Sequence, residues 1–299
     1  MTARKVLMVA PKNFISNPQT VGDNFFQEPL NAAAEEDLAG EATKEFDGLK
    51  NLLTEAGIEV KVFKQHDDLV TPDALFPNNW FSTFPDNSFA IYPMMAENRR
   101  LERRPEMISY LRKNYAKQID LTHDEKRGIF LEGTGSLVMD HAHKIAYASL
   151  SQRTSSNVTH EWGKLTGYDV ILFSSYDRNK ELIYHTNVMM CVAEKFAVVC
   201  LESLEDEDAR ERVKFSLAGS GHEIIEITLE QVHHFCGNCL ELENKNGDKF
   251  FIMSDEAYDH FSDDLRQRIE KNSKILHTGL HTIEKVGGGG VRCMMAELF

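Results

Sequence analysis

Five short motifs recur along this chain, and their repeat constrains the fold more than any other feature of the sequence. Each motif is a polar or glycine-containing turn that opens into an apolar run: FPNNWFSTF, LEGTGSLVM, YHTNVMMCV, FCGNCLELE and GGVRCMMAEL. The turn residues just before the runs are Asn79, Gly135, Asn187, Asn238 and Arg292, which are 56, 52, 51 and 54 positions apart. Because a unit of about fifty residues cannot bury a core alone, the five units must share one.

The segments between the motifs repeat as well. A second extended run follows each of the first four motifs: SFAIYP, KIAYAS, KFAVVC and KFFIMS. Helical patterns then precede a further short strand, as in EFDGLKNLLTEAG before IEVKVF, RPEMISYLRKNYA before KQIDLT and DARERVKFSLAGSG before HEIIEIT. The fifth unit has no strand after Cys293, so we expect the N-terminal KVLMVA to complete it and anchor the C-terminus. The regular spacing favours one α/β domain over residues 1–299, with units around an axis and helices outside, over two unrelated α/β domains.

The charge balance excludes some partners. The 33 basic and 47 acidic residues give a net charge of −14, whereas nucleic acids and anionic membranes require cationic surfaces. The one basic cluster, NRRLERR at 98–104, is interleaved with glutamates and is predicted to begin a solvated, salt-bridged helix. The sequence shows neither a signal peptide nor an apolar run of roughly 20 residues. Five cysteines, an odd number, favour a reducing compartment. We therefore expect a cytoplasmic protein with a small-molecule partner, and a homo-oligomer stays open.

Cys293, His185 and Glu132 lie in three of the motifs, and turns that meet on an axis would bring their side chains together. A thiol, an imidazole and a carboxylate in one pocket indicate nucleophilic catalysis, because the thiolate attacks and a nearby imidazolium lowers the pKa of a cysteine. Three amides from the same turns join this group: Asn78, Asn79 and Asn187. A lone cysteine is more often a small buried apolar residue. The glycine run before Cys293 and its place in the repeat favour the catalytic interpretation.

Two further features of the FCGNC motif have ordinary explanations. Asn238 is interpreted as a turn former, since asparagine tolerates left-handed backbone and mimics turns. Cys236 and Cys239 form a CxxC pair after His233 and His234, as some zinc ligands do. No second pair follows at zinc-finger spacing, so the sequence predicts no metal site.

The motifs resemble those of the guanidine-modifying, or pentein, superfamily of arginine deiminases, dimethylarginine hydrolases and amidinotransferases. The resemblance implies a five-bladed αβ propeller with pseudo-fivefold symmetry and a central active site, built from a Cys near the C-terminus, a His that opens an HxD motif and a Glu in an EG turn. GGGGVRC matches at Cys293, YHTN at His185 and LEGTG at Glu132. Together FPNNWFST, NRRLERR, LEGTGS, YHTNVMM, GNCLEL and GGVRCM are most similar to the citrulline utilization hydrolases, from MVAPKNF to the last residues.

Two positions depart from the superfamily pattern. Members that act on a guanidinium clamp the cation with two aspartates, where this chain has Asn79 and Asn187. Losing both carboxylates costs about 2–5 kcal/mol of binding to a desolvated cation. An amide can donate to a carbonyl oxygen and accept from N–H groups, as a neutral ureido group requires. The sequence therefore favours citrulline-like over arginine-like substrates.

The predicted reaction is attack of the Cys293 thiolate on the ureido carbon of citrulline or a relative. We expect Glu132 to hydrogen-bond the ureido N–H and to orient the imidazole of His185, which protonates the departing ammonia and then activates water. Asn79 and Asn187, with Asn78, would orient the ureido group. The candidates for the substrate α-carboxylate are Arg292 and one of Arg153 or Arg178. No metal or organic cofactor is required.

Other activities remain open at this point. Within the superfamily, the chain could be an arginine deiminase, a dimethylarginine hydrolase or an amidinotransferase. A non-catalytic pentein, such as the ribosome-associated translation factor of this fold, is disfavoured by the presence of Cys293, His185 and Glu132 and by the negative charge.

Overall fold

Fifteen strands form five three-stranded sheets in the computed structural model, which describes residues 1–22, 24–27, 38–66 and 68–299. In spatial order the sheets are β15 (Ala296–Leu298), β1 (Lys5–Ala10) and β2 (Glu59–Lys64); β3 (Phe81–Phe84), β4 (Ser88–Ile91) and β5 (Lys117–Asp120); β6 (Val138–Asp140), β7 (Ile145–Ser149) and β8 (Asp169–Phe173); β9 (Met190–Val192), β10 (Phe196–Val199) and β11 (Glu223–Glu226); and β12 (Leu240–Glu243), β13 (Lys249–Ser254) and β14 (Lys274–Thr278). Each middle strand pairs antiparallel with one neighbour and parallel with the other. The five repeated α/β units predicted from the motif spacing are confirmed.

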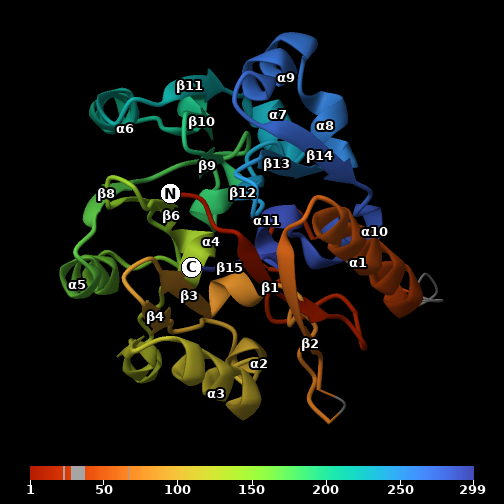
Figure 1. Cartoon of the computed structure of the whole chain (residues 1–299). Coiled ribbons are helices and arrows are strands. Elements are labelled where there is room, and N and C mark those ends of the chain that lie inside the picture. Colours follow the sequence, from red (N-terminus) through yellow and green to blue (C-terminus); the bar gives the residue numbers. More distant parts are fainter. Residues whose placement is uncertain (23, 28–37, 67) are drawn as a thin grey trace.

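Helices connect the parallel strand pairs, because parallel neighbours require a crossover connection. The connecting helices are α1 (Leu38–Glu55), α3 (Pro105–Asn114), α5 (Ser156–Thr166), α6 (Glu207–Gly219), α8 (Asp255–His260) and α9 (Asp263–Glu270). The shorter helices are η2 (Pro77–Asn79), α2 (Glu97–Arg100), η3 (Thr122–Arg127), α4 (Gly133–Ser136), η4 (Thr186–Val188), η5 (Leu201–Ser203), α7 (Leu229–His233), α10 (His281–Gly287) and α11 (Val291–Met294). In Figure 1, α1, α3, α5, α6 and α9 lie on the outside of the molecule, as expected.

Helix α1 shows why a connecting helix packs inward. Phe46, Leu49 and Leu53 recur on one face of the helix and are buried. This face contacts β14 and α10. Gly57, in the left-handed conformation at φ +82°, follows the helix and turns the chain into β2.

The fifth sheet joins the two ends of the chain. Strand β1 pairs antiparallel with β15, with Lys5 opposite Leu298 and Leu7 opposite Ala296, and parallel with β2. The prediction that KVLMVA completes the last unit is confirmed. A strand does follow Cys293, contrary to expectation, because three residues are too few to show a recognisable alternation. The N and C labels accordingly lie near each other in Figure 1.

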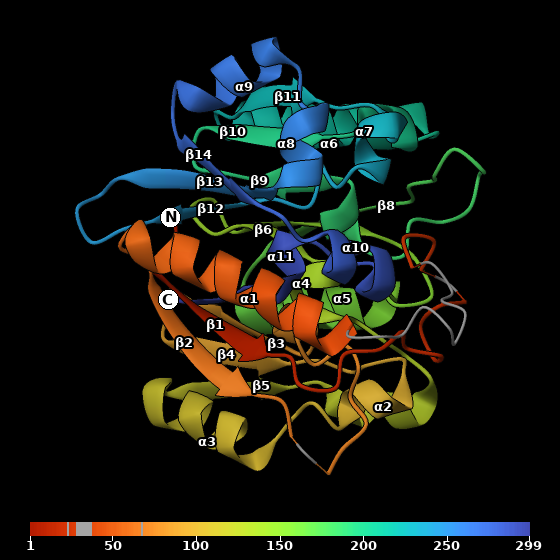
Figure 2. The same ribbon diagram turned by 90° about the vertical axis from the view of Figure 1, so that its right-hand side faces the viewer.

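Short helices that carry the motifs meet at the centre. Helix α4 contacts η2 and η4, and α11 also contacts η2. The two glycines of LEGTG permit this approach: a Cβ atom on Gly133 would lie 2.4 Å from the Asn78 carbonyl oxygen, and one on Gly135 would lie 2.5 Å from Asn79 Nδ2. Figure 2, turned by 90°, again has α4 and α11 in the middle of the molecule.

The prediction that the basic cluster at 98–104 begins a solvated, salt-bridged helix is wrong for two of its residues. Arg99 and Glu102 are buried, at 2% and 3% exposure, and do not belong to a solvated helix face. The Arg99 guanidinium donates to Glu102 at 2.9 Å and to Asn79 Oδ1 at 2.7 Å. Burial raises the pKa of Glu102 to about 7, against the opposing effect of the Arg99 charge. The ion pair between Arg99 and Glu102 is therefore buried, whereas the sequence predicted solvated ion pairs for this cluster.

Of the helices in the described ranges, none combines the length and the apolar character that crossing a membrane requires.

We predict that β15 is a firmly packed strand although it is three residues long. Leu298 is 5% exposed and belongs to a hydrophobic cluster with Leu7 and Ile91. Leu298→Ala is expected to lower the free energy of unfolding by about 2–5 kcal/mol, measured by urea denaturation. Leu165→Ala is the matched control, because Leu165 is 44% exposed and its truncation should change stability by no more than about 0.5 kcal/mol. Equal effects of the two variants would contradict this packing.

Candidate active site

Cys293 lies on α11, directly after the glycine run, and is 5% exposed. The run packs against an aromatic ring: Cβ atoms on Gly287 and Gly289 would each lie 2.9 Å from Phe76 Cζ. Gly288 between them has φ +65°, which side chains disfavour. The glycines thus allow close packing beneath the thiol.

Two amides contact the thiol. Asn238 Nδ2 donates to Cys293 Sγ at 3.3 Å, and Asn187 Nδ2 donates to it at 3.5 Å. Asn238 Oδ1 in turn accepts from the backbone N–H of Arg292 at 3.2 Å. The interpretation of Asn238 as an ordinary turn former therefore missed its contact with the sulfur. Its alignment in the repeat with Asn79 and Asn187 was the signal that could have identified it.

The surroundings of the Cys293 thiol favour its protonated form. Burial raises the pKa of Cys293, and the hydrogen bonds from Asn238 and Asn187 offset this in part. The sequence suggested that a neighbouring imidazolium would lower the pKa, but burial lowers the pKa of His185, which favours its neutral form. The resting pair is therefore a thiol and a neutral imidazole.

Glu132 and His185 form a buried hydrogen bond of 2.9 Å between Oε2 and Nε2. The backbone N–H of Met95 donates to the other carboxylate oxygen at 3.0 Å, and Arg153 Nη1 lies 3.6 Å from Oε2. Burial by itself would raise the pKa of Glu132, but the charge of Arg153 and the bond to His185 outweigh it and lower the pKa to about 2. The carboxylate is thus anionic, and a neutral His185 that donates through Nε2 keeps Nδ1 as a proton acceptor.

Several amide atoms at the centre are buried without a hydrogen-bond partner among the described residues. They are both side-chain atoms of Asn78, Nδ2 of Asn79 and Oδ1 of Asn187. The three side chains are at most 3% exposed. Buried polar atoms of proteins are nearly always paired. Asn187 also contacts the thiol of Cys293, and Asn79 Nδ2 and His185 Nδ1 pack against the same glycine. Unpaired donors and acceptors among these residues indicate a place where a polar ligand binds.

The orientation of Asn79 is fixed by a charge. Arg99 Nη1 donates to Asn79 Oδ1 at 2.7 Å, so the NH₂ group must point the other way. A Cβ atom on Gly135 would lie 2.5 Å from Asn79 Nδ2 and 2.7 Å from His185 Nδ1, so both nitrogens pack closely against the same glycine. Asn79 thus has its donor on the side of Gly135 and His185, and its acceptor on the side of Arg99.

The structure does not bring every predicted residue into this group. The Arg292 guanidinium donates to Glu297 at 2.9 Å and to a backbone carbonyl. Arg153 lies against Glu132 and is 2% exposed. Arg178 forms an ion pair with a surface glutamate. Each guanidinium therefore has an acidic neighbour.

The CxxC pair is placed away from the nearby histidines. Cys236 Sγ donates to the carbonyl of Ala257 at 3.5 Å, and Cys239 Sγ donates to the carbonyl of Cys236 at 3.4 Å. Both residues are fully buried, and burial raises the pKa of both thiols. These thiols are packed as small apolar groups.

Comparisons with known proteins agree with the fold. Residues 10–299 match the family model described as N,N dimethylarginine dimethylhydrolase, eukaryotic. Among curated proteins, no sequence matches the chain. The chain is similar to ArgZ, an arginine dihydrolase from the ornithine-ammonia cycle in cyanobacteria, with a TM-score of 0.77 and 17% identity over 98% of this chain and 40% of that one.

Two further solved structures are similar. Unliganded AgrE has a TM-score of 0.74 and 18% identity over 99% of this chain and 39% of its own. A dimethylarginine dimethylaminohydrolase, as an adduct with S-methyl-L-thiocitrulline, has a TM-score of 0.68 and 14% identity over the whole of both chains. This chain thus spans about two fifths of the ArgZ and AgrE chains, and 97% of the N-terminal domain of ArgZ. At these identities the likeness shows the fold.

The raised pKa of Cys293 predicts how the free protein reacts with iodoacetamide. Because the thiolate reacts, the rate of alkylation at Cys293 should rise with pH and have its midpoint above about 8.5, the ordinary value of a cysteine. Peptide mass spectrometry after timed quenching measures the rate at this residue, and Cys293→Ser gives the background from the other four cysteines. A plateau reached below pH 7 would contradict the neutral resting pair.

Proposed function

Because the chain belongs to the eukaryotic N,N dimethylarginine dimethylhydrolase family, within the pentein superfamily, we propose that it is a cysteine-dependent hydrolase. Its substrate would be an arginine-related amino acid, cleaved at a C–N bond of the ureido or guanidino group. The buried thiol of Cys293, the neutral imidazole of His185 and the anionic Glu132 support this chemistry. We also propose that the five sheets are the blades of one propeller domain, with this site on its axis.

Within this class we propose a ureido substrate, with citrulline as the best candidate. The observation that carries the choice is the orientation of Asn79: Arg99 holds its oxygen, and its NH₂ group lies on the side of Gly135 and His185. A guanidinium carries N–H donors and a positive charge but no acceptor, so it cannot pair with this donor. The ureido oxygen of citrulline can accept from it.

The other unpaired amides fit the rest of a ureido group. Asn187 Oδ1 is an acceptor for the terminal NH₂ of the substrate, and Asn78 has both a donor and an acceptor without partners. The charges of the site also favour a neutral ureido substrate, because the carboxylate of Glu132 already has Arg153 and His185 as partners. A second cation in this buried space would lack an anion of its own.

The proposed reaction begins with a proton transfer. With substrate bound, His185 Nδ1 takes the proton of the Cys293 thiol, and the thiolate attacks the ureido carbon. The bond from that carbon to the terminal nitrogen breaks, and the imidazolium gives its proton to the departing ammonia. His185 then takes a proton from water, and the resulting hydroxide attacks the S-carbamoyl carbon while the thiolate leaves. The carbamate product decomposes to ornithine and carbon dioxide.

The family description favours a second candidate, hydrolysis of N,N-dimethylarginine. The same three residues would act, with attack on the guanidino carbon, dimethylamine as the leaving group and citrulline as the product. In that reaction Glu132 would have to bind the cationic substrate in addition to its present partners. The unpaired Asn79 donor favours the ureido substrate over this one.

The two candidates differ in their products. Citrulline, arginine and N,N-dimethylarginine are each incubated with the protein, and ammonia, dimethylamine, ornithine and citrulline are measured by chromatography. We expect ammonia and ornithine from citrulline, and no release from any substrate by Cys293→Ser. Dimethylamine or ammonia released with accumulation of citrulline would establish the guanidino reaction and refute the ureido choice.

Replacing the Asn79 donor by an acceptor tests the basis of this choice. In Asn79→Asp, the oxygen bound by Arg99 is kept and a carboxylate oxygen replaces the NH₂ group. We expect kcat/KM for citrulline to fall by at least roughly tenfold, and the ratio of arginine to citrulline turnover to rise. Asn114→Asp is the control, since it makes the same change on an exposed residue of α3. If both variants keep wild-type selectivity, the role given to Asn79 is wrong.

A further inference from the structure

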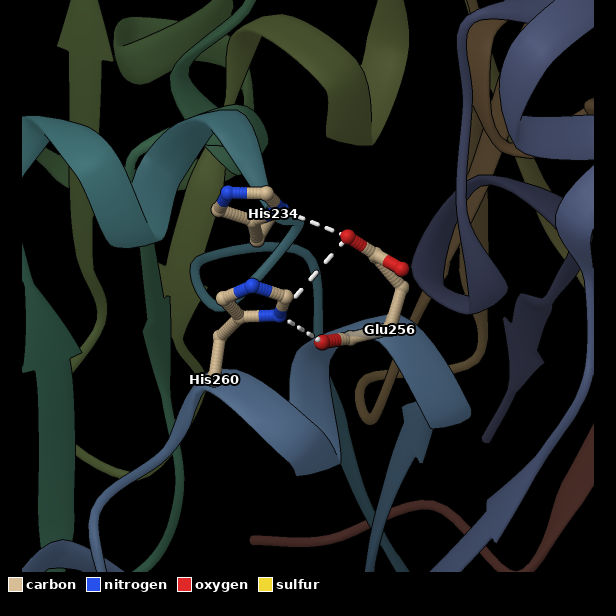
Figure 3. Close-up of side chains that lie close together, drawn as sticks. All are labelled: His234, Glu256 and His260. Atoms are coloured by element: carbon tan, nitrogen blue, oxygen red, sulfur yellow. Dashed lines mark hydrogen bonds and ion pairs between the residues drawn. The ribbon is translucent and has the colours of Figure 1, made fainter.

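Three side chains of the kinds that bind metals converge outside the active site: His234, Glu256 and His260 (Figure 3). His234 directly follows α7, and the other two lie four residues apart on one face of α8. One nitrogen of each imidazole and one carboxylate oxygen all lie within 4.8 Å of one another. The described part of the chain has one other such group, His123, Asp124 and Glu161, which contains a single imidazole.

The two imidazoles are arranged as a pair. Their rings are stacked with centroids 3.5 Å apart and an angle of 3° between the planes, so the in-plane lone pairs of the two rings do not converge on one point. Binding of one metal ion by both rings therefore requires one imidazole to turn out of the stack. Glu256 Oε1 contacts Nδ1 of His234 and lies 3.7 Å from Nδ1 of His260. Figure 3 shows the same carboxylate facing both rings. Two imidazoles and a carboxylate with an open fourth position are a common ligand set for zinc.

The second nitrogen of His234 also has an acidic neighbour. His234 Nε2 lies 3.3 Å from Glu230 Oε1, while Nδ1 faces Glu256. A neutral imidazole has one N–H group and can donate to one of these two carboxylates. The short contact to Glu256 is a hydrogen bond, so Nδ1 carries the proton when no metal is bound. Metal binding would release that proton to water and let Nε2 donate to Glu230, so that Nδ1 and the Glu256 oxygen could both bind the cation. Metal-bound histidines commonly have such a carboxylate on the outer nitrogen.

We propose that His234, Glu256 and His260 bind one divalent transition-metal ion of the zinc type, with Glu230 orienting the imidazole of His234. On binding, His260 Nδ1 exchanges its 2.8 Å hydrogen bond to the carbonyl of Glu256 for the metal. Cys236 is not a ligand, since its thiol is fully buried against a backbone carbonyl.

A metal ion at this site would stabilise the turn from His234 to Asn238, which extends to the candidate active site. His234 precedes Asn238, the donor to Cys293 Sγ, by four residues. A Cβ atom on Gly290 would lie 3.3 Å from Phe235 and 2.9 Å from Asn238, so this turn packs against the glycine run. Metal binding joins α7 to α8 and thereby fixes one side of the turn that holds Asn238. The metal is a positioning element and takes no part in the reaction steps.

Zinc titration of the full chain tests the site. Calorimetry on metal-free Cys293→Ser, chosen because the thiol of Cys293 could itself bind zinc, should give one zinc ion per chain. Adding Glu256→Gln or His260→Gln should weaken binding by at least roughly tenfold, and Glu230→Gln by about 10–100-fold or less. His277→Gln is the matched control: His277 bonds Asp255 at 2.6 Å and stacks on Tyr258, outside the three proposed ligands, so its loss should leave affinity unchanged.

A spectroscopic readout identifies the ligands. Cobalt(II) bound at this site should give the visible bands of a tetrahedral nitrogen and oxygen set without a thiolate charge-transfer band. Thermal unfolding of the metal-free variants, equal to that of the parent protein, separates loss of the site from loss of the fold. Absence of stoichiometric binding, undiminished binding in both ligand variants, or a thiolate band would each overturn the proposal.

Discussion

A carboxylate buried at the centre of the molecule, that of Glu132, orders the groups around the reactive thiol. Removing a carboxylate from water costs several kcal/mol unless partners compensate. Arg153, His185 and the backbone N–H of Met95 are these partners, and each is held in place by the need to satisfy the charge. The hydrogen bond to Glu132 also decides which nitrogen of His185 carries the proton. It follows that Arg153 stabilises the carboxylate, while its role toward the substrate α-carboxylate stays a prediction from the sequence.

The buried guanidinium of Arg99 orients the side-chain amide of Asn79. Arg99 is held by Glu102 and lies 3.8 Å from Asp73, and its Nη1 donates to Asn79. Buried ion pairs are often no more stabilising than apolar residues of the same volume. Their effect here is to orient a neutral amide, whose two ends differ in what they can bind. The guanidinium that first suggested a surface salt bridge thus sets the hydrogen-bonding character of a residue in the candidate site.

The repeat made most of the architecture predictable, because periodic apolar runs and glycine turns are local signals that tertiary packing preserved. The convergence of the motif turns followed from the same repeat. What the sequence did not indicate depends on long-range geometry. Arg292 was a candidate for the substrate carboxylate, but its guanidinium pairs with Glu297 on β15, a strand too short to recognise. Asn238 looked like an ordinary turn residue, since only the fold shows that its amide reaches Cys293.

In the resting site the proton lies on the sulfur of Cys293, so the substrate or the neighbouring amides must stabilise the thiolate when it forms. Burial raises the pKa of Cys293 and lowers that of His185, so the proton stays on sulfur. A cationic guanidinium beside the thiol would itself favour the thiolate, whereas a neutral ureido group supplies no such charge. An enzyme for ureido substrates must then stabilise the thiolate with its own dipoles. Asn187 and Asn238, which both donate to the sulfur, are suited to this, and the amides around Cys293 would serve the nucleophile as well as the substrate.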